Sequence, residues 1–144
     1  MIAATRMGDG SLWASLAVIV IVFGGARRFE ALAAAVMAGS VGVGLFMKLK
    51  RVIGRKRPCA IEPHCWAKLL PPDQFSFPSG HTITAFSVAM ALDMFYPEMR
   101  VGLVFCAGSI AASRVLLGMH FLSDVIAGAM LGTLLGFTSA SIFI

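Results

Sequence analysis

The chain has 144 residues, of which 58% are hydrophobic and 13% are charged, and its formal net charge is +5. Soluble domains carry about 25% charged residues, so this composition excludes an ordinary globular domain, a disordered chain and a fibrous protein. It predicts an all-α integral membrane protein. Because each spanning helix takes about 20 residues, we expect one membrane-embedded domain over residues 1–144 and no separate soluble domain.

Five apolar runs predict a helical bundle of about five transmembrane helices with alternating direction. The first run is short enough to be the apolar part of a signal peptide. Because Asp9 precedes it and no small-residue cleavage pattern follows, we expect a retained helix. The last run carries no charge from Val125 onward. The five runs are Leu12 to Ala26, Ala31 to Met47, Ile83 to Tyr96, Val101 to Leu117 and Phe121 to Ile144.

Short turns join most of the predicted helices, but a loop of more than thirty residues, Lys48 to Gly80, separates the second from the third. Long loops in compact proteins usually carry function, so we expect the catalytic face here. The loop also contains Cys59 and Cys65. This pair forms a disulfide if the loop faces an oxidising compartment and stays as thiols if it faces the cytosol; the sequence leaves both readings open.

Small residues recur at every fourth position of the last predicted helix, at Gly128, Gly132, Gly136 and Ala140. This spacing places them along one helix face, where a neighbouring backbone can approach closely. We therefore predict tight helix packing at this face and no binding role.

Two charged residues, Arg114 and Asp124, lie against or within apolar runs, where a charge is costly and usually marks a functional site. They flank His120. If the last helix starts near Met119, His120 and Asp124 share one helical face, and the carboxylate can orient the imidazole. The alternative is a packing ion pair between Asp124 and Arg114, and these residues alone favour neither reading.

Alternating helix direction brings the polar residues of four segments to one membrane face. Three of these residues, Lys50, Arg57 and Arg114, supply positive charge, and the two arginines can make paired hydrogen bonds to phosphate-like oxygens. At the start of the third predicted helix, the backbone N–H groups of residues 79–81 point to the same place, and the helix dipole favours an anion there. The arrangement predicts an oxyanion site for a phosphoryl group.

Three motifs in this region resemble the three-part signature of the type-2 phosphatidic acid phosphatase superfamily. All three match in order and spacing, and together they span residues 50–124. They are Lys50 followed after six residues by Arg57-Pro58; Pro78-Ser79-Gly80-His81; and Ser113-Arg114, then five residues, His120, three residues and Asp124.

The resemblance implies a role for each site residue. His120 would be the nucleophile that forms a phosphohistidine, Asp124 its orienting partner and His81 the general acid for the leaving oxygen. A neutral histidine beside a second, proton-carrying histidine is suited to such a two-step transfer. The residues implied to bind the phosphoryl oxygens are Lys50, Arg57, Ser79, Gly80 and Arg114.

The function expected from these features is hydrolysis of a lipid phosphate. The resemblance suggests phosphatidylglycerol phosphate, phosphatidic acid, undecaprenyl diphosphate, a polyprenyl-phosphate sugar phosphate or lipid A, and the sequence does not rank them. A lipid phosphotransferase and a non-catalytic lipid-binding protein stay open as alternatives. We expect no metal and no other cofactor, because Asp124 is the one acidic residue inside the signature and a two-metal site needs several carboxylates or histidines.

Membrane lipids are the other expected partners. The basic residues lie between apolar runs, so we expect contact with anionic lipid and none with nucleic acid. We also interpret four of them as an interfacial cluster apart from the catalytic set, and place His64 outside that set. The cluster residues are Lys48, Arg51, Arg55 and Lys56.

The expected location is the cell (inner) membrane, with several spans. Nine Lys and Arg residues on the site face against three opposite favour a cytoplasmic site. Bacterial members of the superfamily often act on the outer leaflet, and on that ground we expect an extracytoplasmic site. The usual membrane members have six helices, with the first motif after the third. In this chain the first motif follows the second predicted helix, so one N-terminal helix is expected to be missing. A homodimer would then cover the surface that this helix leaves exposed.

Overall fold

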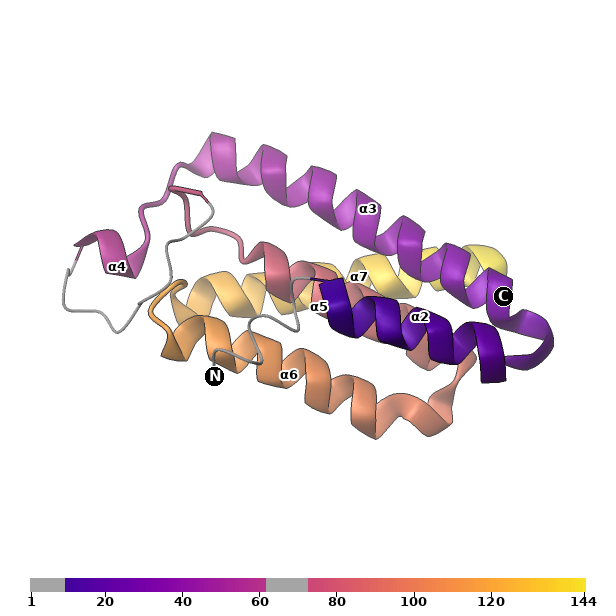
Figure 1. Ribbon diagram of the computed structural model, residues 1–144. Helices are drawn as coiled ribbons and strands as arrows, with labels where there is room; N and C mark the ends of the chain where they lie inside the picture. Colours follow the sequence, from indigo (N-terminus) through magenta and orange to yellow (C-terminus); the bar gives the residue numbers. More distant parts are fainter. Residues whose placement is uncertain (1–9, 62–72) are drawn as a thin grey trace.

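The computed structural model describes residues 10–61 and 73–144. In these two ranges, five long helices run along a common axis, and short helices join or follow them (Figure 1). Within the described residues there is no β-strand, so the all-α prediction is confirmed. The long helices are α2 (Leu12–Phe23), α3 (Arg28–Ile53), α5 (Gly80–Phe95), α6 (Arg100–Leu116) and α7 (Leu122–Phe143); the short ones are η2 (Gly25–Arg27), α4 (Pro58–Ile61) and η3 (Pro97–Met99).

Helix α3 continues further than the sequence suggested. Its last turn includes Lys50 and Arg51, so the expectation that the loop begins at Lys48 is wrong. Lysine and arginine are good helix formers, and their charge stabilises the negative end of the helix dipole. The helix ends at Gly54, whose φ of 62° lies in the left-handed region that glycine adopts without strain.

Among the described residues, three helical segments are long and apolar enough to cross a membrane: Gly25–Ile53, Pro97–Leu116 and Leu122–Phe143. Helix α2 is apolar but shorter. Large apolar side chains are exposed on the outside of the bundle, Phe105 at 73% among them, as expected for a surface in contact with lipid. The structure is therefore that of a multi-pass membrane bundle, and the number of spans stays a prediction.

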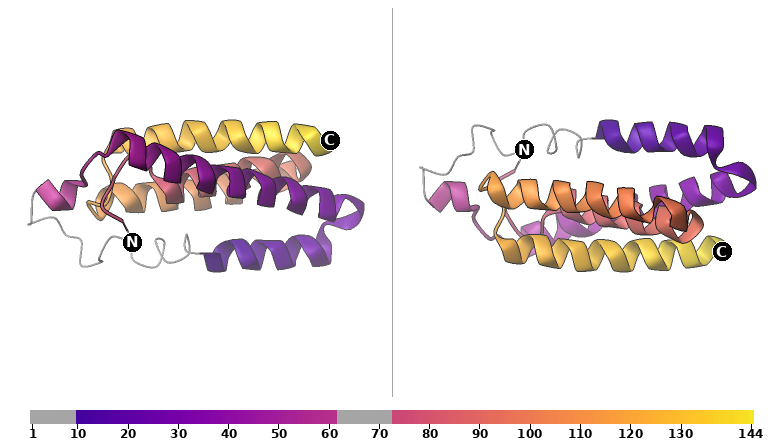
Figure 2. Two further views of the ribbon diagram at one scale, coloured as in Figure 1. Left: turned by 90° about the horizontal axis from the view of Figure 1, so that it is seen from above. Right: turned by 90° about the horizontal axis from the view of Figure 1, so that it is seen from below.

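Helix α5 lies at the centre of the bundle, packed against α3, α6 and α7, whereas α2 lies on the outside next to α3 (Figure 2). The buried side chains of α5 are mostly small, such as Ala85 and Ala89, and this lets the surrounding helices approach closely. The turns η2 and η3 lie at one end of the bundle. The C-terminal ends of α3 and α6 and the starts of α5 and α7 lie at the other end (Figure 1).

The glycine face of α7 packs directly against the α5 backbone, which confirms the packing predicted from the spacing. A Cβ on Gly128 would approach the Ser79 carbonyl at 3.0 Å, and one on Gly132 would approach the Ile83 carbonyl at 2.5 Å. The same holds for Gly136. This contact sets the relative position of the two helix starts that carry His81 and Asp124.

We expect Gly132→Ala to destabilise the protein by about 2 kcal/mol, because the added methyl would collide with backbone and α5 and α7 would have to separate. Thermal unfolding in detergent measures the effect. Gly108→Ala is the matched control, since nothing lies within 4 Å of a Cβ at that helical position. An equal loss of stability in both variants would contradict the packing explanation.

Candidate active site

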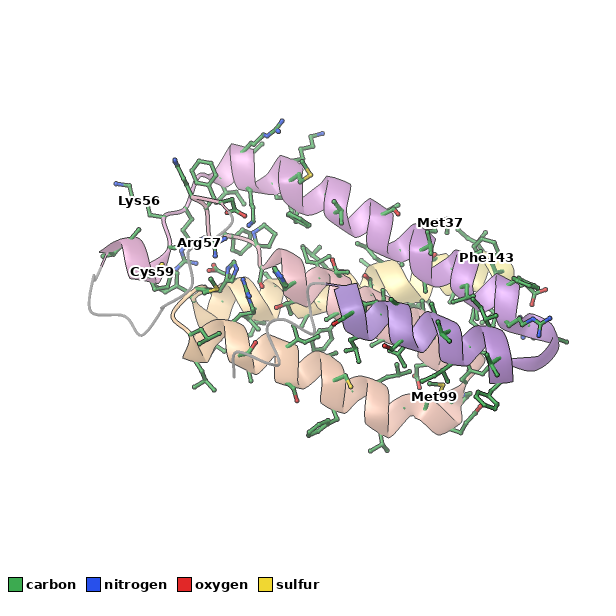
Figure 3. The ribbon with its side chains drawn as sticks, viewed as in Figure 1. Met37, Lys56, Arg57, Cys59, Met99 and Phe143 are labelled. Carbon is green, nitrogen blue, oxygen red and sulfur yellow. The ribbon has the colours of Figure 1, made fainter. Side chains whose placement is uncertain are left out.

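Helices α3 and α6 end, and α5 and α7 begin, at the same end of the bundle (Figure 1), and polar side chains of these four segments are buried there. Arg57 extends into this group from the segment between α3 and α4 (Figure 3). The convergence predicted from alternating helix direction is therefore what the fold produces. Most of these groups are buried although polar: Lys50, Arg57, Ser79, Arg114, His120 and Asp124.

Arg57 lies at the centre of the group and is only 1% exposed. Its Nη1 donates to the Met119 carbonyl at 2.9 Å and lies 3.1 Å from His120 Nε2. Its Nε donates to the Asp73 carbonyl at 2.8 Å, and its Nη2 donates to Asp73 Oδ1 at 2.9 Å. One guanidinium thus connects the first motif, the third motif and the segment that leads into the second.

His120 is held by a turn between α6 and α7. Gly118 has a φ of 65°, and the N–H groups of Met119 and His120 both donate to the Arg114 carbonyl at 3.1 Å. Because α7 begins at Leu122, the premise that His120 lies on the helix face of Asp124 is wrong. The left-handed Gly118 closes the turn, and the extended Phe121 caps the new helix, so the chain becomes helical three residues later than expected.

The imidazole of His120 is oriented mainly by a backbone oxygen. Its Nδ1 lies 2.6 Å from the Ser76 carbonyl oxygen and 3.7 Å from Asp124 Oδ2. Because a carbonyl oxygen can only accept, Nδ1 carries the proton in the neutral ring. Nε2 therefore keeps its lone pair, on the side that faces Arg57, which is the state that a nucleophile requires.

Asp124 joins the second and third motifs. Its Oδ2 accepts the Phe121 N–H at 2.9 Å and its Oδ1 accepts Arg55 Nη1 at 2.8 Å. Its carbonyl oxygen accepts the Ser79 N–H at 3.2 Å, at the start of α5. Asp124 thus places the phosphoryl-binding helix start and the histidine turn relative to each other.

Arg55 belongs to this site, contrary to its interpretation as an interfacial residue. Its guanidinium carbon lies 4.1 Å from the Phe121 ring centroid, and the same Nη1 that binds Asp124 donates to Ser123 Oγ at 2.8 Å. The sequence signal for this place in the site is the position of Arg55, two residues before Arg57 within the first motif. The other members of the proposed interfacial cluster are exposed: Lys48, Arg51 and Lys56.

Asp73 is the second residue that the sequence analysis missed. Its Oδ2 accepts Lys50 Nζ at 2.5 Å, and its Oδ1 binds Arg57. Burial acts to raise the pKa of Asp73, but the hydrogen bonds from Lys50 and Arg57 outweigh it and hold that pKa below its usual value. The Asp73 carboxylate therefore binds Lys50 and Arg57, two of the three cations that the sequence predicts to bind phosphate.

The start of α5 has the form expected for an anion-binding helix end. Ser79 is the N-cap, and its buried Oγ accepts the Thr82 hydroxyl at 2.9 Å. A Cβ on Gly80 would lie 3.1 Å from the Phe46 ring, so the glycine fits a tight contact with α3. His81 follows in the first turn and is half-buried. The Ser79 N–H already donates to the Asp124 carbonyl, so it does not join the N–H groups expected to face an anion, whereas the helix dipole favours a negative group at this helix end.

The remaining predictions about the long loop fall partly outside the described residues. His64 and Cys65 belong to the undescribed segment 62–72, so the pairing of Cys59 with Cys65 stays a prediction. No group of three or more His, Cys, Asp or Glu side chains suited to a metal ion occurs in residues 10–61 and 73–144.

We expect His120 to titrate with a midpoint near pH 4. Burial lowers its pKa to about 4 from the usual 6.5, and the charges of Arg57 and Arg114 act in the same direction, against the raising effect of Asp124. Between about pH 4 and pH 6.5 the unfolded chain binds more protons at His120 than the folded chain does. The contribution of His120 to stability therefore rises with pH in this range and is lost as the pH falls toward 4.

This titration is measurable by NMR on protein with labelled histidines, since the chain has 3 of them and His120→Asn identifies the signal. A midpoint near pH 6.5 would contradict a buried, neutral nucleophile.

Comparison with known proteins identifies similar chains. The model of the PAP2 superfamily matches residues 28–143. A lipid A 1-phosphatase of Rhizobium johnstonii is 31% identical over 159 residues, covering 96% of this chain and 65% of that protein. The chain thus spans slightly less than two thirds of that relative's length.

Two crystal structures share the fold. One is LpxE of Aquifex aeolicus, with a TM-score of 0.82 and 27% identity over 97% of this chain and 82% of that one. The other is a transmembrane PAP2-type phosphatidylglycerolphosphate phosphatase of Bacillus subtilis, with a TM-score of 0.72 and 28% identity over 99% of this chain and 74% of that one.

Proposed function

This chain belongs to the PAP2 superfamily, as its three motifs indicated, and from that premise we propose that it is an integral membrane phosphatase that hydrolyses a terminal phosphate or diphosphate of a membrane lipid. The observation that carries the proposal is the contact of 3.1 Å between Arg57 Nη1 and His120 Nε2, which puts an unprotonated nitrogen beside a buried cation. A nucleophile next to a phosphoryl-binding charge is what phosphoryl transfer requires.

In the first step, Arg57, Lys50, Arg114 and the start of α5 hold the phosphoryl oxygens. Nε2 of His120 attacks phosphorus, the bond from phosphorus to the lipid oxygen breaks, and His81 gives its proton to that oxygen. The product is a phosphohistidine and a free lipid alcohol, or a lipid monophosphate if the substrate is a diphosphate. The fixed cations stabilise the charge on the transferring group.

In the second step, water attacks the phosphohistidine. His81, now neutral, takes a proton from this water, the P–N bond breaks and orthophosphate leaves. In the first step the imidazole ring gains positive charge, because Nδ1 keeps its proton while Nε2 bonds phosphorus, and in the second step the ring loses that charge as the P–N bond breaks. The Ser76 carbonyl and the Asp124 carboxylate both face Nδ1 and stabilise that charge.

The substrate is a lipid with a terminal phosphate, since the relatives' names cover lipid A and phosphatidylglycerol phosphate and no described contact favours one of them. The other candidate substrates are phosphatidic acid, undecaprenyl diphosphate and polyprenyl-phosphate sugar phosphates, and all of them belong in the panel of lipids to be tested. A lipid phosphotransferase would use the same intermediate with an alcohol in place of water. We also propose an extracytoplasmic site and a homodimer.

The test is phosphate release from this lipid panel by purified protein in detergent, in the presence of a chelator. We expect release without added metal. Activity that is lost in chelator and restored by magnesium would contradict the histidine mechanism. Transfer to an added alcohol in place of labelled water would identify a phosphotransferase, and no release from any lipid would favour a lipid-binding protein.

A further inference from the structure

Asp73 is an internal anion in the phosphoryl-binding group. Its two carboxylate oxygens contact Lys50 Nζ at 2.5 Å and Arg57 Nη2 at 2.9 Å, and its carbonyl oxygen accepts Arg57 Nε at 2.8 Å. Charge-assisted hydrogen bonds of this kind are about twice as strong as neutral ones. Asp73 therefore makes the contacts that a phosphoryl group would make with the same two cations.

The donors of Arg57 show how much of its binding capacity Asp73 occupies. A guanidinium has five N–H groups. Two of them are directed at Asp73, one at the Met119 carbonyl and one at His120 Nε2, which leaves one for a further oxygen among the described residues. Attack by Nε2 on phosphorus releases the Nη1 N–H that faces it, but the Nη2 N–H bound to the Asp73 carboxylate becomes available to a phosphoryl oxygen only if that carboxylate leaves.

The surroundings of Asp73 allow it to move. The side chains of Lys50 and Arg57 are 9% and 2% exposed, whereas that of Asp73 is 37% exposed. An open pocket of about 530 Å³ lies beside it, between the end of α3 and residues 73–75. Arg51, which is exposed, lines the same pocket and offers the displaced carboxylate another cation.

We propose that Asp73 is a specificity-determining residue: it occupies the phosphoryl-binding cations until a doubly charged phosphate displaces it, and so excludes the singly charged phosphodiesters of ordinary membrane lipids. This inference rests on the proposed function. A terminal phosphate carries a charge of about −1.5 to −2 at neutral pH, whereas a phosphodiester carries one charge and gains little by replacing a carboxylate.

Direct binding of inorganic phosphate to the full chain in neutral detergent tests the inference without any turnover. Calorimetry at pH 7.5 compares the wild type with Asp73→Asn, Asp73→Glu and the control Asp93→Asn, which removes an acid paired with Arg100 at the other end of α5. We expect Asp73→Asn to bind phosphate about tenfold more tightly than the wild type, because the substitution removes one charge-assisted contact that competes with phosphate. The other two variants should stay within about threefold of the wild type.

A second measurement is inhibition of phosphate release by phosphatidylglycerol, a phosphodiester lipid. We expect inhibition to be weak in the wild type and to strengthen about tenfold in Asp73→Asn, because its cations no longer have a competing charge. Unchanged or weaker binding of phosphate to Asp73→Asn would overturn the inference and would mean that Asp73 positions Lys50 and Arg57.

If Asp73→Asn is unstable in the absence of ligand, phosphate should raise its Tm more than it raises that of the wild type; a smaller rise contradicts the inference. Failure of the proposed function has a different signature: phosphate binds and tightens in Asp73→Asn, but no lipid is hydrolysed.

Discussion

Replacing His120 by asparagine is expected to lower phosphate release by about 10⁴-fold or more, because the substitution removes the nitrogen that forms the covalent intermediate. Asparagine keeps an N–H that can reach the Ser76 carbonyl and keeps much of the ring's volume, so the loss should not come from unfolding. The measurement is the rate of phosphate release from the best lipid of the panel, with Tm recorded for the same sample.

The intermediate itself gives a second readout. Rapid quenching of wild-type enzyme with labelled substrate should trap an acid-labile phosphoenzyme, and the asparagine variant should trap none. His64→Asn is the matched control, since this histidine lies outside the three motifs, and it should keep both activity and labelling. Turnover that persists in the His120 variant would exclude the phosphohistidine mechanism.

Arg57→Lys is expected to lower kcat/KM by about 10³-fold, although it preserves the charge. A lysine has no planar fork and cannot contact Asp73, the Met119 carbonyl and His120 together, so the phosphoryl group would lose its paired contacts. We also expect the free energy of unfolding to fall by about 3 kcal/mol, because the variant leaves buried acceptors without donors. Denaturant titration in micelles and lipid phosphate kinetics measure the two effects.

Arg100→Lys is the matched control for Arg57. Arg100 also pairs with an aspartate, Asp93, at 2.9 Å, but its side chain is 62% exposed. Exposed pairs of this kind contribute about 0 to 1 kcal/mol, so the variant should keep its stability and its activity. Activity and stability that stay unchanged in Arg57→Lys, as in Arg100→Lys, would show that Arg57 acts through its charge alone.

Helix content and most of the site were accessible from the sequence because their signals are local. Apolar runs have a period and a length, and the motifs around Arg57, Ser79 and His120 are short patterns of chemically distinctive residues. Helix direction then sufficed to bring them together. The glycine spacing of α7 likewise predicted its packing, because the contact depends on residue size alone.

The contacts that the sequence did not predict are long-range or involve the backbone. Arg55 and Asp124 are 69 residues apart; the position of Arg55 within the first motif points to the site, but it does not identify Asp124 as the partner. The Ser76 carbonyl that orients His120 leaves no sequence signal, since every residue has one. Asp73 lies outside the three motifs, so the motifs do not predict its role, yet the fold brings its carboxylate into contact with Lys50 and Arg57.

The same long-range contacts determine the order in which the protein can become active as it folds. Each helix closes its own hydrogen bonds within four residues, but the bonds of the site join residues 63 and 69 positions apart, Arg57 with His120 and Arg55 with Asp124. Local contacts form in microseconds or less, whereas distant ones wait for loop closure and helix docking. The site is therefore complete only after these distant segments have docked, and helix formation alone does not put the nucleophile in place.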